Sequence, residues 1–153
     1  MRHAKLLFLG LSPLLLSGCV SLSLNVDKEN DEGRTEQVIN YSYEDVKEYK
    51  IYWNDIFKQP YDLYYVYLYS STCSHCNSIK NEMIKYALGE NETLFFVSSS
   101  AEHVLDENID KFEHIDSLEN LAIKGYPTLL KLEQKVVVKN LAGTKDITTE
   151  LNI

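Results

Sequence analysis

The most informative part of this chain is the stretch LYYVYLYSSTCSHC, residues 63–76. Its first half, Leu63 to Tyr69, contains a valine and four tyrosines in a nearly uninterrupted β-forming run, which is typical of a central strand covered on both faces. Its second half places two thiols, Cys73 and Cys76, before a segment with helical character at Asn77 to Leu88. Thiols at that spacing on the first turn of a helix lie close enough to form a disulfide.

The position of Cys73 favours a reactive sulfur. A helix N-terminus offers unpaired N–H groups and a partial positive charge, and both favour a thiolate at the first cysteine. Because the thiolate is the nucleophile in disulfide exchange, Cys73 is the candidate attacking group. The neighbours Ser74 and His75 are candidate modulators, since an imidazole beside the thiols stabilises a thiolate and makes the disulfide more oxidising. The alternative for His75 is a solvated side chain without such a role.

The same cysteine spacing occurs in zinc sites, which normally use a second pair of Cys or His ligands. No second pair stands out here, because the other histidines, His3, His103 and His114, are not at ligand spacing. We therefore predict a redox dithiol with no metal and no cofactor. A metal site and a buried inert pair are the alternatives.

Residues 1–18 have the pattern of a targeting segment. The positively charged start is followed by an apolar run, Leu6 to Leu16, that is too short for a membrane span of about 20 residues and suits a signal peptide. The run ends in Leu16-Ser17-Gly18-Cys19, which resembles the lipobox of bacterial lipoproteins. That resemblance implies cleavage before Cys19 and acylation of its sulfur, as by palmitate. An ordinary secretory peptide with a chance cysteine is the alternative.

This assignment predicts a protein anchored by lipid to the cell membrane, on the extracytoplasmic face, where a disulfide can persist. Residues 19–40 are polar and charged, and we expect a lipidated N-terminus followed by a flexible tether with a reach of roughly 25 Å. Residues 41–153 suit one small domain. The net charge of −8 becomes −10 once Arg2 and Lys5 leave with the signal peptide, which argues against nucleic acid as a partner.

Hydrophobic periodicity predicts the element order α-β-α-β-α-β-β-α within the domain. A parallel β-α-β unit and a closing hairpin together give a mixed sheet flanked by helices, an α/β fold. The expected elements are a helix capped by Ser42 and ending before Pro60, the strand Leu63 to Tyr69, the helix Asn77 to Leu88, the strand Leu94 to Val97, a short helix near His103 to Asn108, a helix over Ser117 to Ile123, the strands Thr128 to Leu132 and Val136 to Leu141, and a final helix over Ile147 to Leu151.

Two motifs in this order resemble the thioredoxin superfamily over residues 41–153. They are Thr72-Cys73-Ser74-His75-Cys76 after a strand and Lys124-Gly125-Tyr126-Pro127-Thr128 before the hairpin. The resemblance implies a thioredoxin-like fold, with Cys73 attacking and Cys76 resolving. It also implies a cis bond at Pro127 and a Tyr126 backbone that pairs with an extended substrate. The chain departs from the family at Tyr67, where a buried acid is common, and at Thr72, where a tryptophan is common.

The function that this resemblance implies is a thiol–disulfide oxidoreductase, an enzyme acting on extracytoplasmic protein thiols and disulfides. We expect a monomer with a membrane electron donor or acceptor, and we favour reductase or general exchange activity because no dimerisation region of the isomerase type is evident. One alternative is an accessory or binding lipoprotein in which the Cys73–Cys76 disulfide is structural. The other is a metal-handling module with Cys73, His75 and Cys76 as ligands.

Overall fold

The computed structural model describes residues 39–107 and 114–153. The predicted signal peptide at 1–18, the lipidation site Cys19 and nearly all of the predicted tether at 19–40 lie outside the described residues. The last residue of the helix predicted near His103 to Asn108 lies outside them as well. Within the described residues, none of the helices has the length and apolar character needed to cross a membrane.

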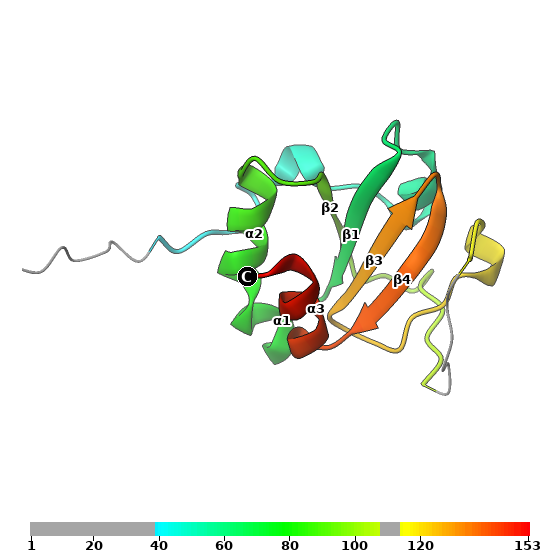
Figure 1. Cartoon of the computed structure of the whole chain (residues 1–153). Coiled ribbons are helices and arrows are strands. Elements are labelled where there is room, and N and C mark those ends of the chain that lie inside the picture. Colours follow the sequence, from blue (N-terminus) through cyan, green and yellow to red (C-terminus); the bar gives the residue numbers. More distant parts are fainter. Residues whose placement is uncertain (1–38, 108–113) are drawn as a thin grey trace, which may run out of the picture. The chain divides into compact units, whose positions relative to one another are not determined.

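The domain is built on a four-stranded mixed sheet in the order β2-β1-β3-β4 (Figure 1). Its strands are β1 (Leu63–Tyr69), β2 (Leu94–Ser98), β3 (Thr128–Glu133) and β4 (Val136–Ala142). Strand β1 is parallel to β2 and antiparallel to β3, and β4 returns antiparallel to β3. This mixed sheet, with helices packed against it, confirms the predicted thioredoxin-like α/β class.

Strand β1 contributes to a core on each side of the sheet. Successive side chains of a strand point to opposite faces, and here every residue from Tyr64 to Tyr69 is buried. Tyr65, Tyr67 and Tyr69 pack into one hydrophobic cluster, whereas the alternate residues pack into the other. The prediction of a central strand covered on both faces is therefore confirmed, and most of the tyrosines of this run serve as core.

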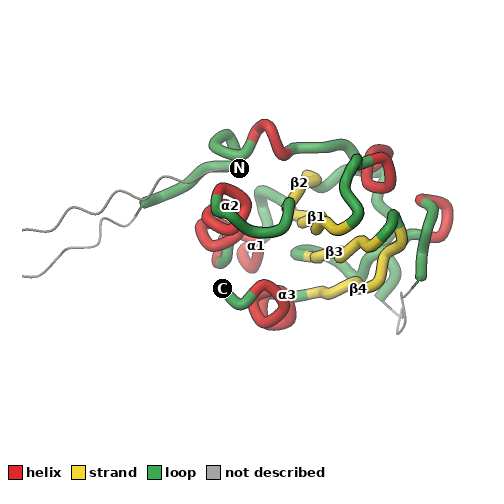
Figure 2. The backbone as a smooth tube through the Cα atoms, turned by 45° about the horizontal axis from the view of Figure 1, so that its top comes forward, coloured by secondary structure: helices red, strands yellow, loops and turns green. Residues whose placement is uncertain are grey.

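Three α-helices lie on the Tyr67 side of the sheet (Figure 2). They are α1 (Ser74–Ser78), α2 (Lys80–Leu88) and α3 (Thr144–Leu151). The single helix predicted over Asn77 to Leu88 is wrong in its start and its continuity. It begins earlier because the Cys73 side chain caps α1, and it breaks at the buried Ile79, whose backbone (φ −115°, ψ 10°) leaves the helical region.

The long first helix predicted between Ser42 and Pro60 is also wrong. Two short 3₁₀ helices, η1 (Lys47–Tyr49) and η2 (Trp53–Lys58), take its place. The chain between them is extended, because Lys50 forms a parallel bridge with Phe96 and the Ile51 N–H donates to the Phe96 carbonyl at 3.0 Å. Pairing with the edge of the sheet replaces the helical hydrogen bonds. Helix η2 then covers the other face of the sheet through Trp53 and Ile56.

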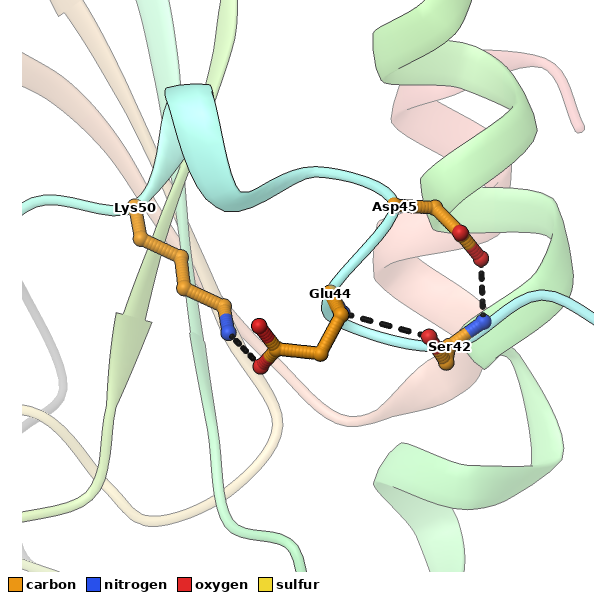
Figure 3. A network of polar contacts seen from close by, with 4 residues as sticks. All are labelled: Ser42, Glu44, Asp45 and Lys50. Carbon is orange, nitrogen blue, oxygen red and sulfur yellow. Dashed lines mark hydrogen bonds and ion pairs between the residues drawn. The ribbon is translucent and has the colours of Figure 1, made fainter.

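Ser42 caps a turn and not a helix (Figure 3). The Asp45 carboxylate accepts a hydrogen bond from the Ser42 N–H at 2.7 Å, and the Ser42 hydroxyl accepts one from the Glu44 N–H at 3.3 Å. An ion pair between Lys50 and Glu44 at 2.6 Å spans the same turn. The turn places the ring of Tyr43 against Tyr69, with their centroids 3.8 Å apart.

Two further helices of the sequence prediction are wrong in the described residues. Residues 103–107 are not helical. In place of the helix predicted over Ser117 to Ile123, the structure has only the short 3₁₀ helix η3 (Leu118–Asn120). The cause is a pairing of the two segments, in which the Ile123 N–H donates to the Val104 carbonyl at 2.9 Å and Leu105 bridges Ile123. The predicted hairpin is confirmed, and its turn residues Gln134 and Lys135 both have positive φ.

Phe96 provides a test of this packing. It is fully buried and meets the rings of Tyr43, Tyr67 and Tyr69 edge-on. We expect Phe96→Ala to lower the free energy of unfolding by about 3–5 kcal/mol in urea titrations, because it removes a fully buried ring. The control Tyr52→Ala removes a ring that is 81% exposed, and should change it by less than about 0.5 kcal/mol. Equal losses for the two variants would contradict the described core.

Candidate active site

The loop after β1 carries Cys73 directly into the first helix. The Cys73 N–H donates to the Ser70 carbonyl at 3.2 Å, which closes a turn after the strand. The Asn77 N–H donates to the Cys73 carbonyl at 3.1 Å and starts α1. The hydroxyls of Ser70 and Thr72 lie 3.0 Å apart and hydrogen-bond within the turn. Local hydrogen bonds therefore fix the first thiol at the N-cap of the helix.

The Cys73 sulfur is partly exposed and has two polar neighbours. It accepts a hydrogen bond from the Cys76 N–H at 3.2 Å, as the side chain of an N-cap residue does. Its S–H group donates to the Tyr126 carbonyl at 3.5 Å. A backbone N–H directed at the sulfur stabilises a thiolate, and partial exposure allows another sulfur to approach. Cys73 is therefore the more accessible thiol of the pair.

Cys76 has the opposite character. It is fully buried in the cluster beneath the helices, and the two cysteines are not joined by a disulfide. Burial, together with the hydrogen bond to Cys73, raises the pKa of the Cys76 thiol to about 12. At neutral pH Cys76 is therefore protonated while Cys73 faces solvent. An attacking and a resolving thiol require this asymmetry.

Sheet pairing brings the second sequence motif to the first. Thr128 at the start of β3 pairs with Leu68 near the end of β1, so the loop before β3 lies beside the cysteines. The Tyr126–Pro127 peptide bond is cis, which confirms that prediction. The Gly143 N–H donates to the Pro127 carbonyl at 2.9 Å and ties this loop to the start of α3.

Ser74 and His75 are exposed on the first turn of α1. His75 lines a groove of about 300 Å³ between the cis-proline loop and the start of α3. Its ring makes no polar contact with either sulfur within the described part of the chain, so its effect on the thiols stays a prediction. The groove is lined by His75, Tyr126, Pro127, Ala142, Gly143, Thr144, Lys145 and Asp146.

His103 belongs to the surroundings of the site, although no sequence motif placed it there. Its Nδ1 atom hydrogen-bonds the Tyr126 hydroxyl, and its ring stacks on Trp53 with centroids 4.5 Å apart. Burial lowers the pKa of His103, which favours a neutral ring at neutral pH. His103 therefore holds the side chain of Tyr126, the residue whose backbone carbonyl contacts Cys73. The polar composition of residues 98–116 carries no periodic signal for this contact.

Tyr43 and Tyr67 are two further residues of the site. Both pack into the cluster that contains Cys76, and each interacts electrostatically with that thiol. The sequence marked Tyr67 only as a departure from the family pattern.

Over the described ranges, no group of three or more His, Cys, Asp or Glu side chains is arranged to hold a metal ion.

The sequence matches no protein-family model, and no curated protein is significantly similar to it. Among solved structures, it is similar to thioredoxin f2 of Chlamydomonas reinhardtii at 19% identity, covering 68% of this chain and 91% of that one, with a TM-score of 0.48. Thioredoxin f of spinach chloroplast, in its short form, has 18% identity over 66% and 86% of the two chains, with a TM-score of 0.44.

A thioredoxin-fold protein of Helicobacter pylori is also similar, at 25% identity. The match covers 71% of this chain and 73% of that one, with a TM-score of 0.40. These three proteins have the fold that the two sequence motifs resemble. The fold class of this chain rests on its own strand order, which places Cys73 after β1 and Pro127 before β3.

The unequal exposure of the two thiols predicts unequal alkylation. When the reduced, folded protein is treated briefly with iodoacetamide at neutral pH, we expect mass spectrometry to find the label on Cys73 and not on Cys76, because Cys76 is buried and protonated. In guanidinium chloride both thiols should react at similar rates. Equal labelling of the two cysteines in the folded protein would contradict the described site.

Proposed function

We propose that this chain is a thiol–disulfide oxidoreductase in which Cys73 attacks and Cys76 resolves. The observation that carries the proposal is the environment of the Cys73 sulfur. Cys73 is partly exposed, and its sulfur accepts a hydrogen bond from the Cys76 N–H and donates one to the Tyr126 carbonyl. Its partner thiol, Cys76, is buried. An inert structural pair needs no such difference between its two sulfurs.

The exchange has two steps. The Cys73 thiolate attacks one sulfur of a substrate disulfide, so that a mixed disulfide forms and the other substrate sulfur leaves as a thiolate. Cys76 then loses its proton and attacks the Cys73 sulfur, which breaks the mixed disulfide and releases the second substrate thiolate. Two electrons pass to the substrate, and the chain keeps a Cys73–Cys76 disulfide. A dithiol electron donor in the membrane would restore the reduced pair.

The substrate class that suits the site is an extended segment of an extracytoplasmic protein. A groove runs beside Tyr126 and Pro127 in the cis-proline loop, and an extended peptide in it could pair with the Tyr126 backbone as an added strand does. We favour reduction or general exchange as the direction of the reaction. In this proposal a lipid on Cys19 would hold the domain close to envelope proteins.

Trapping of the mixed disulfide tests the enzymatic role. We expect Cys76→Ser to accumulate mixed disulfides between Cys73 and envelope proteins, because the second step is blocked after the first has occurred. The measurement is non-reducing electrophoresis of acid-quenched cells, followed by mass spectrometry. The matched control is Cys73→Ser with Cys76→Ser, which should trap nothing. If the single variant is folded but also traps nothing, the accessory role with a structural disulfide takes precedence.

The anchor has a separate test. Replacement Cys19→Ala should abolish incorporation of labelled palmitate, because it removes the sulfur that would be acylated. The protein should then leave the membrane fraction or remain unprocessed with its signal peptide. The control Cys73→Ala should keep the label. Retention of the label in Cys19→Ala would exclude this cysteine as the lipidation site.

A further inference from the structure

Two buried tyrosine hydroxyls share the core cluster of the buried thiol. They belong to Tyr43 and Tyr67, and within residues 39–107 and 114–153 neither oxygen has a partner in hydrogen-bonding geometry. An unpaired buried hydroxyl lowers stability, because it has lost its hydrogen bonds to water without gaining others. By contrast, two other buried tyrosines of β1 have hydrogen-bond partners for their hydroxyls. Tyr64 donates to the Ile56 carbonyl, and Tyr65 donates to the Glu150 carboxylate. Both unpaired hydroxyls interact electrostatically with the Cys76 thiol.

The surrounding rings hold Tyr67 in place. Its ring lies parallel to that of Tyr69 with centroids 6.1 Å apart, and Phe96 meets it edge-on at 5.9 Å. The ring of Tyr43 stacks on the ring of Tyr69 as well. Because Tyr67 and Cys76 are both fully buried in the same cluster, the hydroxyl can interact with the thiol without competition from solvent.

Cys76 must lose a proton before it can resolve a mixed disulfide, and it must do so inside the core. The titratable side chains that interact with it include Cys73, Tyr43, Tyr67 and Tyr126. Burial and the neighbouring Cys73 raise the pKa of the Cys76 thiol, whereas its interaction with the Tyr67 hydroxyl lowers that pKa. Burial raises the pKa of Tyr67 itself far above its ordinary value, so at neutral pH this hydroxyl keeps its proton and is able to donate a hydrogen bond.

We propose that the Tyr67 hydroxyl is the hydrogen-bond donor that stabilises the Cys76 thiolate during resolution of the mixed disulfide. This inference rests on the proposed function, since it concerns the second step of that exchange. As the Cys76 S–H bond breaks, the proton leaves for water and the Tyr67 O–H turns to the negative sulfur. The thiolate then attacks the Cys73 sulfur and its charge passes to the leaving substrate thiolate. Tyr67 keeps its own proton throughout.

The two steps can be observed separately with dithiobis(nitrobenzoate), an aromatic disulfide that releases one coloured thiolate at each step. The reduced full chain carrying Cys19→Ser is mixed with the reagent in detergent, so that only Cys73 and Cys76 react. The first release reports attack by Cys73, and the second reports resolution by Cys76.

We expect Tyr67→Phe to leave the first release unchanged and to slow the second by about three- to tenfold at neutral pH. Loss of a hydrogen bond to a charged group raises the thiol pKa by about one to two units, so a smaller fraction of Cys76 is thiolate at neutral pH. Because a more basic thiolate is also a better nucleophile, about half of this decrease in the logarithm of the rate is offset. The matched control is Tyr65→Phe. It removes a hydroxyl from the same strand and the same face, but one that is directed at Glu150.

A second variant separates hydrogen bonding from packing. A difluorinated tyrosine at position 67 is a stronger donor of nearly the same shape, and it should accelerate the second release above the wild-type rate. Equal second-phase rates in the wild type, Tyr67→Phe and the fluorinated protein would overturn the role of Tyr67 while leaving the exchange intact. If the folded wild type itself shows no second release, the proposed function fails and not this inference alone.

Discussion

Burial of β1 on both faces is the constraint on which the rest of the domain depends. Because the strand is central, its odd-numbered tyrosines pack against the helices and its even-numbered residues against the opposite core. Its end therefore delivers Cys73 to the N-cap of α1, with Cys76 pointing back into the helix-side core. Antiparallel pairing with β3 brings Tyr126 and Pro127 to the same edge. The site is a consequence of how this strand is covered and paired.

Elements with strong local patterns were predictable from the sequence. The bounds of β1 and the existence of β2 and the hairpin follow from buried runs and turn residues that act over a few positions. The helices expected before Pro60 and after Ser117 were wrong, because long-range pairings with Phe96 and Leu105 took the backbone hydrogen bonds. Periodic apolar residues can fill a core from an irregular segment as well as from a helix, and Trp53 and Ile56 do so here.

The site divides in the same way. Cys73, Cys76 and the cis bond at Pro127 were predictable because each belongs to a short motif. His103 and Tyr43 were not, since they reach the site from irregular segments whose placement depends on the whole fold. Tyr67 was visible only as a departure from a family pattern. The structure gives that departure a physical meaning: a buried hydroxyl lies in the cluster that encloses the resolving thiol.

We propose that Cys73 and Cys76 exchange disulfides while the domain stays folded. The most direct test is an equilibrium titration in glutathione redox buffers, with acid quenching and mass spectrometry to count free thiols and circular dichroism to follow the fold. We expect reversible formation of one Cys73–Cys76 disulfide with no loss of native structure. A disulfide that never forms in any buffer, or that is reduced only when the domain unfolds, would contradict it.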